Sequence, residues 1–148
     1  GHNVQEDLSD ALRRWSLRRV RNVDYVTKGT NVLTEHYGAL MAERPIARDP
    51  STQLNGRFLQ MLQEADIIAV AGEASSHCVK ATVEQVADNI GEEHIKKFRL
   101  LTDAMSPVPA VTAPDGSVIA DFPAIADQFL KDMVARGMQL STTVDFLA

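Results

Sequence analysis

The sequence contains one cysteine, Cys78, among its 148 residues. One cysteine cannot form an internal disulfide, and it excludes a zinc site built from several cysteines. Few cysteines are typical of proteins in a reducing compartment, so we expect a cytoplasmic protein. The sequence also lacks an apolar run of the roughly 18–20 residues that a membrane-spanning helix requires, so we expect it to be soluble.

Positive charge is scarce as well. The sequence has 15 Lys and Arg residues and 20 Asp and Glu residues, so the net charge is −5. This balance gives no general attraction for nucleic acid, and no basic and aromatic residues alternate in a binding stripe. The exception is a cluster of arginines between residues 13 and 21. Their spacing favours the solvated face of an amphipathic helix over a partner-binding patch.

The remaining composition is that of an ordinary soluble α/β protein, with 45% hydrophobic and 24% charged residues. A chain of this length is enough for one substantial core. We find neither internal repeats nor a low-complexity linker. We therefore expect residues 1–148 to form a single α/β domain.

Helical and strand patterns alternate along the chain. Helical spacing is found at 5–19, 34–43, 52–65, 76–90 and 121–136, and strand-like segments at 23–27, 66–71, 97–102 and 138–143. This alternation predicts a parallel sheet with helices on both faces. Few strands are present for such a sheet, and the chain opens on a helix. We therefore expect an N-terminal part of the domain to lie outside this chain.

Cys78 lies between the predicted strand 66–71 and the predicted helix 76–90. Ligands of parallel α/β sheets bind beyond the carboxyl ends of the strands. A helix N-terminus stabilises a thiolate, and the small residues 74–76 let the backbone approach a substrate carbonyl, where N–H groups form an oxyanion hole. Cys78 is a candidate nucleophile on these grounds, while the alternative is a small hydrophobe packed under the helix.

Two charged residues follow other predicted strands. Lys28 closes the segment 23–27 and would face the same rim as Cys78, where a cation can hold a thiolate. A solvated lysine at a strand end is the alternative. Asp103 ends the segment 97–102, where it could orient a loop or simply begin a turn or cap a helix. Neither residue identifies a reaction by its position alone.

Further polar residues lie on the predicted site loops. We name His77, Glu35 and Tyr37, together with Asp103, as candidate pocket residues. As metal ligands, Glu73, His77, Glu35 and His36 lack a recognisable spacing. We therefore predict no metal site from the residues themselves.

Three stretches resemble one known superfamily: YVTKGTNVLTEHYGALMAE (25–43), ADIIAVAGEASSHCVKATVEQV (65–86) and LLTDAMSPV (100–108). They contain a Gly-x-Ala-x-x-x-Cys-Val pattern and an upstream Lys-Gly that ends a strand. In these features the chain resembles the isochorismatase-like cysteine hydrolases, which include nicotinamidases. The resemblance runs from about residue 20 to residue 108.

The resemblance implies a three-layer α/β/α fold with a Rossmann-like parallel sheet. It also implies an Asp–Lys–Cys triad in which Cys78 is the nucleophile and Lys28 is the lysine. A cis peptide bond between Glu73 and Ala74 would turn the N–H groups of Ala74 and Cys78 toward the oxyanion. The reaction implied is hydrolysis of a C–N bond in a small-molecule amide, through a thioester on the cysteine.

The sequence departs from the family at the catalytic Asp. The catalytic Asp of the family lies on a first strand, in an Asp-x-Gln-like segment that these residues do not contain, and Asp24 does not match it. The metal ligands of nicotinamidases lie in the same region, so we expect no cofactor within this chain and zinc only in a longer protein. We therefore expect the C-terminal part of a longer hydrolase domain, impaired in activity as this fragment.

Two consequences concern partners and alternatives. An unpaired sheet edge would favour a homo-oligomer or pairing with the absent N-terminal part. The alternative function is a non-catalytic binding or assembly module that keeps the hydrolase fold. A thiol redox protein is disfavoured because there is no second cysteine to resolve a disulfide.

Overall fold

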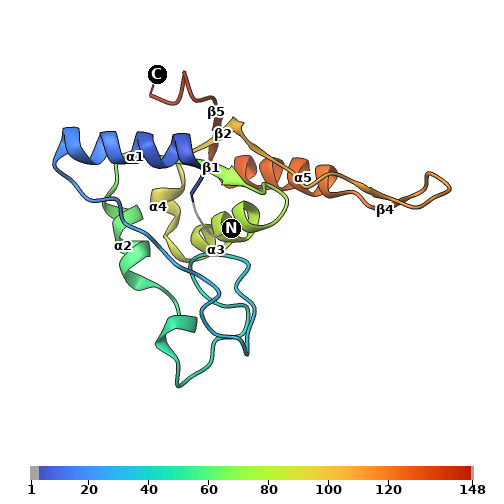
Figure 1. Cartoon of the computed structure of the whole chain (residues 1–148), viewed down its shortest axis with the longest axis horizontal. Coiled ribbons are helices and arrows are strands. Elements are labelled where there is room, and N and C mark those ends of the chain that lie inside the picture. Colours follow the sequence, from blue (N-terminus) through green and yellow to red (C-terminus); the bar gives the residue numbers. More distant parts are fainter. Residues whose placement is uncertain (1–3, 148) are drawn as a thin grey trace.

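The computed structural model describes residues 4–147 as a mixed α/β chain (Figure 1). The helices and strands, in chain order, are α1 (Glu6–Arg19), the short 3-10 helix η1 (Pro50–Thr52), α2 (Gly56–Glu64), β1 (Ile68–Glu73), α3 (Cys78–Asn89), α4 (Glu92–Ile95), β2 (Phe98–Ser106), β3 (Val111–Thr112), β4 (Val118–Ala120), α5 (Phe122–Ala135) and β5 (Gln139–Ser141). No helix in the described part is long and apolar enough to cross a bilayer.

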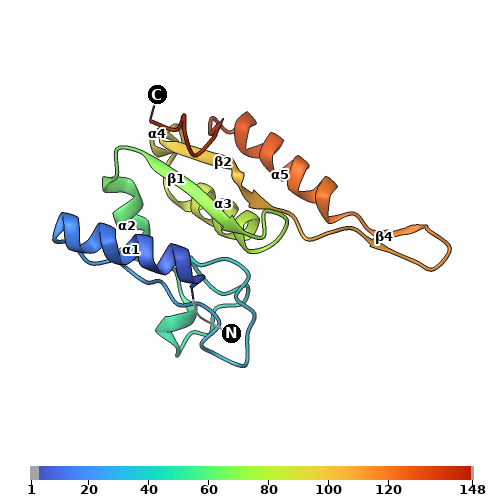
Figure 2. The same cartoon turned by 45° about the horizontal axis from the view of Figure 1, so that its top comes forward.

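The central sheet has the strand order β1-β2-β5, and both pairings are parallel. Figure 2 shows β1 and β2 running side by side. Parallel neighbours need long crossovers, which are supplied by α3 and α4 after β1 and by the segment ending in α5 after β2. The predicted parallel sheet is therefore confirmed, as is the α/β class.

The core forms where α3 and α5 pack on this sheet. Val83 and Val86 of α3, Phe98 and Leu100 of β2, and Phe129 of α5 are each at most 2% exposed. Burial of one such side chain stabilises the fold by roughly 1.5–3 kcal/mol. These apolar positions are therefore what hold the helices against the sheet.

The predicted N- and C-terminal helices are confirmed, and each has the expected end signals. In α1 the Gln5 side chain accepts a hydrogen bond from Leu8 N, and acidic residues begin the helix while arginines end it. In α5 the Asp121 carboxylate accepts from Ala124 N. Gly137 follows α5 with a φ of 105°, a conformation that favours glycine. No residue of α1 is buried.

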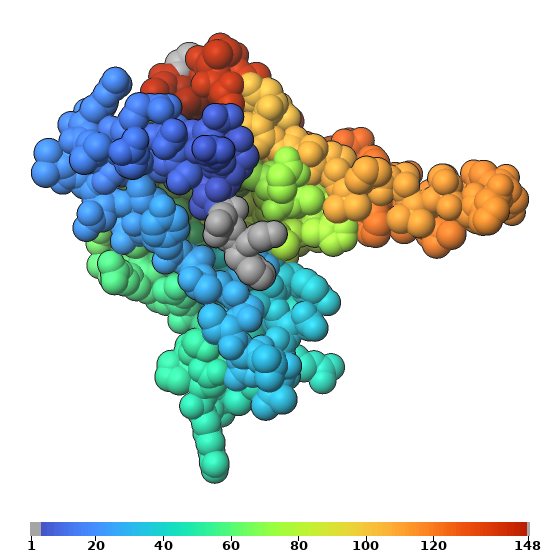
Figure 3. All heavy atoms as spheres, viewed as in Figure 1, coloured from blue at the N-terminus to red at the C-terminus, as the bar shows by residue number. Residues whose placement is uncertain are grey.

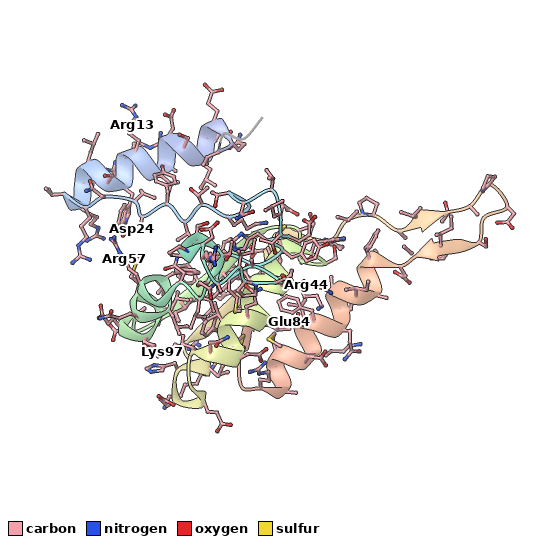
Figure 4. All side chains as sticks on the ribbon, turned by 90° about the horizontal axis from the view of Figure 1, so that it is seen from below. Arg13, Asp24, Arg44, Arg57, Glu84 and Lys97 are labelled. Atoms are coloured by element: carbon pink, nitrogen blue, oxygen red, sulfur yellow. The ribbon has the colours of Figure 1, made fainter. Side chains whose placement is uncertain are left out.

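The predicted strand 23–27 is wrong. These residues have no regular secondary structure, and residues 24–27 line a pocket of about 240 Å³ against α2. Asp24 Oδ1 lies 3.6 Å from Arg57 Nη2 of α2, and Figure 4 labels both residues. A β-strand needs a neighbour for its backbone groups, and this segment runs along a helix instead of the sheet.

The predicted helix 34–43 is also wrong, because this segment bonds to side chains of α3. Gln85 Oε1 accepts from Leu40 N and Met41 N, each at 3.3 Å, and its Nε2 donates to Met41 O. A Cβ on Gly38 would collide with the Gln85 side chain. Long-range hydrogen bonds thus replace the local ones that a helix would make.

Other boundaries differ less. The helix predicted at 52–65 begins at Gly56, because the Asn55 side chain accepts a hydrogen bond from Phe58 N and caps it there. The strand predicted at 97–102 continues to Ser106. Helix α4 and the β3–β4 hairpin have no counterpart in the sequence-based prediction.

We predict that Gln85→Ala lowers the free energy of unfolding by about 2–3 kcal/mol, because three hydrogen bonds to residues 40 and 41 are lost and buried backbone groups stay unpaired. Urea unfolding measures the change. The matched control is Gln128→Ala, which removes one exposed hydrogen bond to Asp132 on α5 and should cost about 0.5 kcal/mol or less. Equal losses in the two variants would contradict the anchoring role of Gln85.

Candidate functional site

Cys78 is the first residue of α3 and follows β1 after a four-residue turn. Its thiol is free, and the residue is half-buried. The cysteine therefore lies at the carboxyl end of β1, and ligands of parallel α/β proteins bind at this end of the sheet. The positive end of the α3 dipole lies at this residue.

The turn before Cys78 is held by backbone hydrogen bonds. The Glu73–Ala74 peptide bond, for which the family resemblance implies a cis conformation, is cis. Ala74 O accepts from His77 N at 2.9 Å and from Val79 N at 3.1 Å, and Ser75 N donates to Ser106 O of β2 at 2.8 Å. The turn is thereby connected both to α3 and to the neighbouring strand.

Several N–H groups of this turn have no acceptor. Within residues 4–147, neither Ala74 N nor Cys78 N donates a hydrogen bond, and the same holds for Ser76 N. His77 occupies the N-cap position, but its side chain makes no capping hydrogen bond. The N–H groups of Ala74 and Cys78 are therefore available to an external acceptor such as an oxyanion.

A groove of about 220 Å³ opens beside Cys78. It is lined by β1 and the first turns of α3, namely Val70, Ala71, Gly72, Glu73, Cys78, Val79, Thr82 and Val83. Most of these side chains are apolar, and the Glu73 carboxylate is the charged group among them. The groove can accept a small, mostly apolar molecule at the thiol.

Lys28 is engaged elsewhere. Its Nζ donates to His36 O at 2.7 Å, and the neighbouring Gly29 N donates to His36 Nδ1 at 3.0 Å. Lys28 does not line the groove at Cys78. The sequence-based placement of Lys28 on the sheet rim depended on a strand at 23–27, and that strand is absent. Its catalytic role stays a prediction from the resemblance.

The candidate pocket residues are spread over different parts of the fold. Glu35 and Tyr37 line a separate pocket of about 320 Å³ together with Arg44. His77 is next to Cys78, but its ring packs on Phe122, with centroids 4.7 Å apart. The structure therefore does not gather these residues around the thiol.

The prediction that Asp103 ends a strand is wrong, because β2 continues past it to Ser106. Its carboxylate accepts hydrogen bonds from the Thr143 hydroxyl and from Thr143 N at 2.9 Å. These bonds lower the pKa of Asp103. Asp103 thus fastens the chain after β5 to β2 and takes no part in the groove.

Two serines outside the predicted site residues fix the turn. Ser76 is only 6% exposed, and its Oγ accepts from Val108 N at 3.0 Å. Ser106 Oγ donates to the Glu73 carboxylate at 3.0 Å. Ser106 lies within the third resembling stretch and precedes Pro107, a signal that could have identified it as a turn contact.

Metal ligands are not assembled in the described residues. Between residues 4 and 147, no group of three or more His, Cys, Asp or Glu side chains is placed to hold an ion. We assign no chemical step to a metal.

Comparison with known proteins gives no further guide, since no family model and no curated protein matches the chain. The assignment of the site depends on the geometry around Cys78.

We predict that Asp103→Asn removes part of the acid sensitivity of folding. Because the folded pKa lies below its ordinary value of 3.8, the stabilisation from Asp103 is present above that value and is lost as the pH falls through the lowered pKa. The measurement is the free energy of unfolding as a function of pH. The control is Asp127→Asn on the exposed surface of α5. A variant with the full wild-type pH dependence would contradict the prediction.

Proposed function

We propose that this chain carries the nucleophile of a cysteine hydrolase that acts on a small-molecule amide. The supporting observation is a free thiol at the first position of α3, next to the unpaired N–H groups of Ala74 and Cys78 and open to a groove. A cysteine packed only as a hydrophobe does not require this combination. The resemblance to the isochorismatase-like hydrolases agrees with it.

The proposed reaction has two covalent steps. The Cys78 thiolate attacks the carboxamide carbon, a C–S bond forms, and the carbonyl electron pair moves to an oxygen held by the N–H groups of Ala74 and Cys78. Collapse of this oxyanion breaks the C–N bond, and ammonia or an amine leaves after taking up a proton. Water then cleaves the thioester, which releases the acid and restores the thiol.

The groove limits the substrate to a small molecule. Its volume of about 220 Å³ is below the roughly 300–1,000 Å³ of typical ligand pockets. Val70, Val79 and Val83 supply an apolar wall, which favours an amide with a compact apolar body. Nicotinamide is one amide of this kind.

The mechanism also needs a group that accepts the proton of the Cys78 thiol, and we propose that another segment supplies it. β1 is hydrogen-bonded to β2 on one side and is the edge strand of its sheet. We propose that a further strand pairs with this free edge, from a second copy or from a preceding part of the protein, and completes a three-layer α/β/α domain. An Asp on that strand would complete the triad with Cys78 and Lys28.

A non-catalytic binding or assembly module is the second candidate. The observation that favours it is the hydrogen bond from Lys28 Nζ to His36 O, which occupies the ammonium group that the triad would need. In that case the turn and groove would bind a small molecule or partner without turnover. Reactivity of Cys78 distinguishes the two functions.

We predict that chloroacetamide, a small electrophilic amide, alkylates Cys78 in the folded chain at least about tenfold faster than in the same chain unfolded in denaturant, because the groove and the unpaired N–H groups of Ala74 and Cys78 hold the amide at the thiol. Mass spectrometry of the digested protein locates the adduct and gives the rates. A rate in the folded chain no higher than in the unfolded chain would contradict a reactive site at Cys78.

Turnover is tested by ammonia release from nicotinamide and other small primary amides, with the protein that includes the proposed further strand. Cys78→Ala should abolish it, whereas Ser16→Ala, a change on the distant helix α1, should not. Full turnover by Cys78→Ala would exclude the proposed nucleophile. A Cys78 that is not alkylated faster in the folded chain, together with no turnover, would favour the binding module.

A further inference from the structure

The chain exposes more surface than a monomer of its size. Its accessible surface is 10126 Å², while a compact monomer of 16.2 kDa exposes about 7,400 Å². The excess of about 2,700 Å² is larger than the roughly 800 Å² that each partner buries in a standard protein interface. The described surface is therefore large enough to supply a stable interface.

Part of this excess lies on the β3–β4 hairpin, which projects from the rest of the molecule (Figures 1 and 3). Its strands pair only with each other. Val111, Val118 and Ile119 are 44%, 58% and 68% exposed. An isolated two-stranded hairpin is marginally stable in water at best, so apolar strands in this position gain stability from a covering surface.

The base of the hairpin is fixed beside the Cys78 turn. Val108 N, at the start of the projection, donates to the buried Ser76 Oγ. At its other end, Phe122 packs against His77, and Asp121 caps α5. The direction of the hairpin is therefore set by contacts with the body of the protein, and little conformational freedom is lost when it docks.

The hairpin is also nearly free of charge. Residues 107–120 contain one charged side chain, Asp115, and its carboxylate accepts hydrogen bonds from Ser117 at the turn. Asp115 contributes −1 to the net charge of −5, and the other parts of the chain carry the remaining −4. Two copies of the hairpin can consequently approach side by side with little repulsion, because one carboxylate at the turn is the charge that each copy carries.

We infer that the β3–β4 hairpin is a dimerisation arm that docks against the same arm of a second copy of this chain. An antiparallel pair of identical strands is compatible with a twofold axis, since each strand offers the other the same donors and acceptors. The free edge of β3 or β4 supplies those backbone groups. This interface differs from the β1 edge, and it does not depend on the chemistry of Cys78.

The test is the oligomeric state of the whole chain, measured by sedimentation velocity over a wide range of concentration. We expect a dimer for the wild type and an association at least about tenfold weaker for Ile119→Lys and for Val118→Lys, because two added cations meet across the axis. The matched control, Val144→Lys, adds the same charge at a valine that is 85% exposed outside the hairpin and should leave the dimer unchanged.

A second measurement does not require a charge at the interface. Ile119→Cys in a Cys78→Ser background should form a disulfide-linked dimer on mild oxidation, whereas Val144→Cys in that background should not. A monomeric wild type would overturn the inference. So would a dimer that persists in Ile119→Lys but is lost in Ala71→Lys, since Ala71 is an exposed residue of β1. Circular dichroism confirms that each variant is folded.

Discussion

The parallel pairing of β1 with β2 is the constraint on which the rest of the described structure depends. It aligns Glu73 with Ser106 at the carboxyl ends of the strands. This alignment brings Ser106 O to Ser75 N and Ser106 Oγ to the Glu73 carboxylate. The same strand end that fixes the Cys78 turn also begins the path to the hairpin. The pairing shifts register between Val70 and Gly72, and the register after this shift positions the candidate nucleophile and the projecting arm together.

Helix α3 has two roles in this arrangement. Its apolar residues, including Val83 and Val86, pack in the core, while Thr82 and Gln85 bind the backbone of residues 39–41. These polar side chains accept hydrogen bonds from backbone N–H groups of a segment that has no secondary structure of its own. The helix whose N-terminus carries Cys78 is thus held both by the sheet and by a long loop, which keeps the thiol and its neighbouring N–H groups in place.

The groups available to a ligand at Cys78 are backbone N–H groups, and the charged side chains predicted for the site are bonded elsewhere. The N–H groups of Ala74 and Cys78 are free to bind an oxygen acceptor, but Lys28 is bonded to His36 O and Asp103 to Thr143. A site of this kind can bind and react with an electrophile before it can turn over an amide, because turnover also needs a proton acceptor. Reaction of the thiol with an electrophile can therefore be measured separately from amide turnover.

The sequence by itself determined the elements whose signals are local: the helices α1, α3 and α5, the parallel strands, and the placement of Cys78 between a strand and a helix. Periodicity and helix end signals are properties of neighbouring residues. Only the tertiary structure decided residues 23–43, where contacts with α2 and with Gln85 of α3 replaced the predicted strand and helix. It also decided that Lys28 lies against His36 and that a hairpin projects after β2. These outcomes depend on hydrogen bonds between residues far apart in the chain, which no local pattern contains.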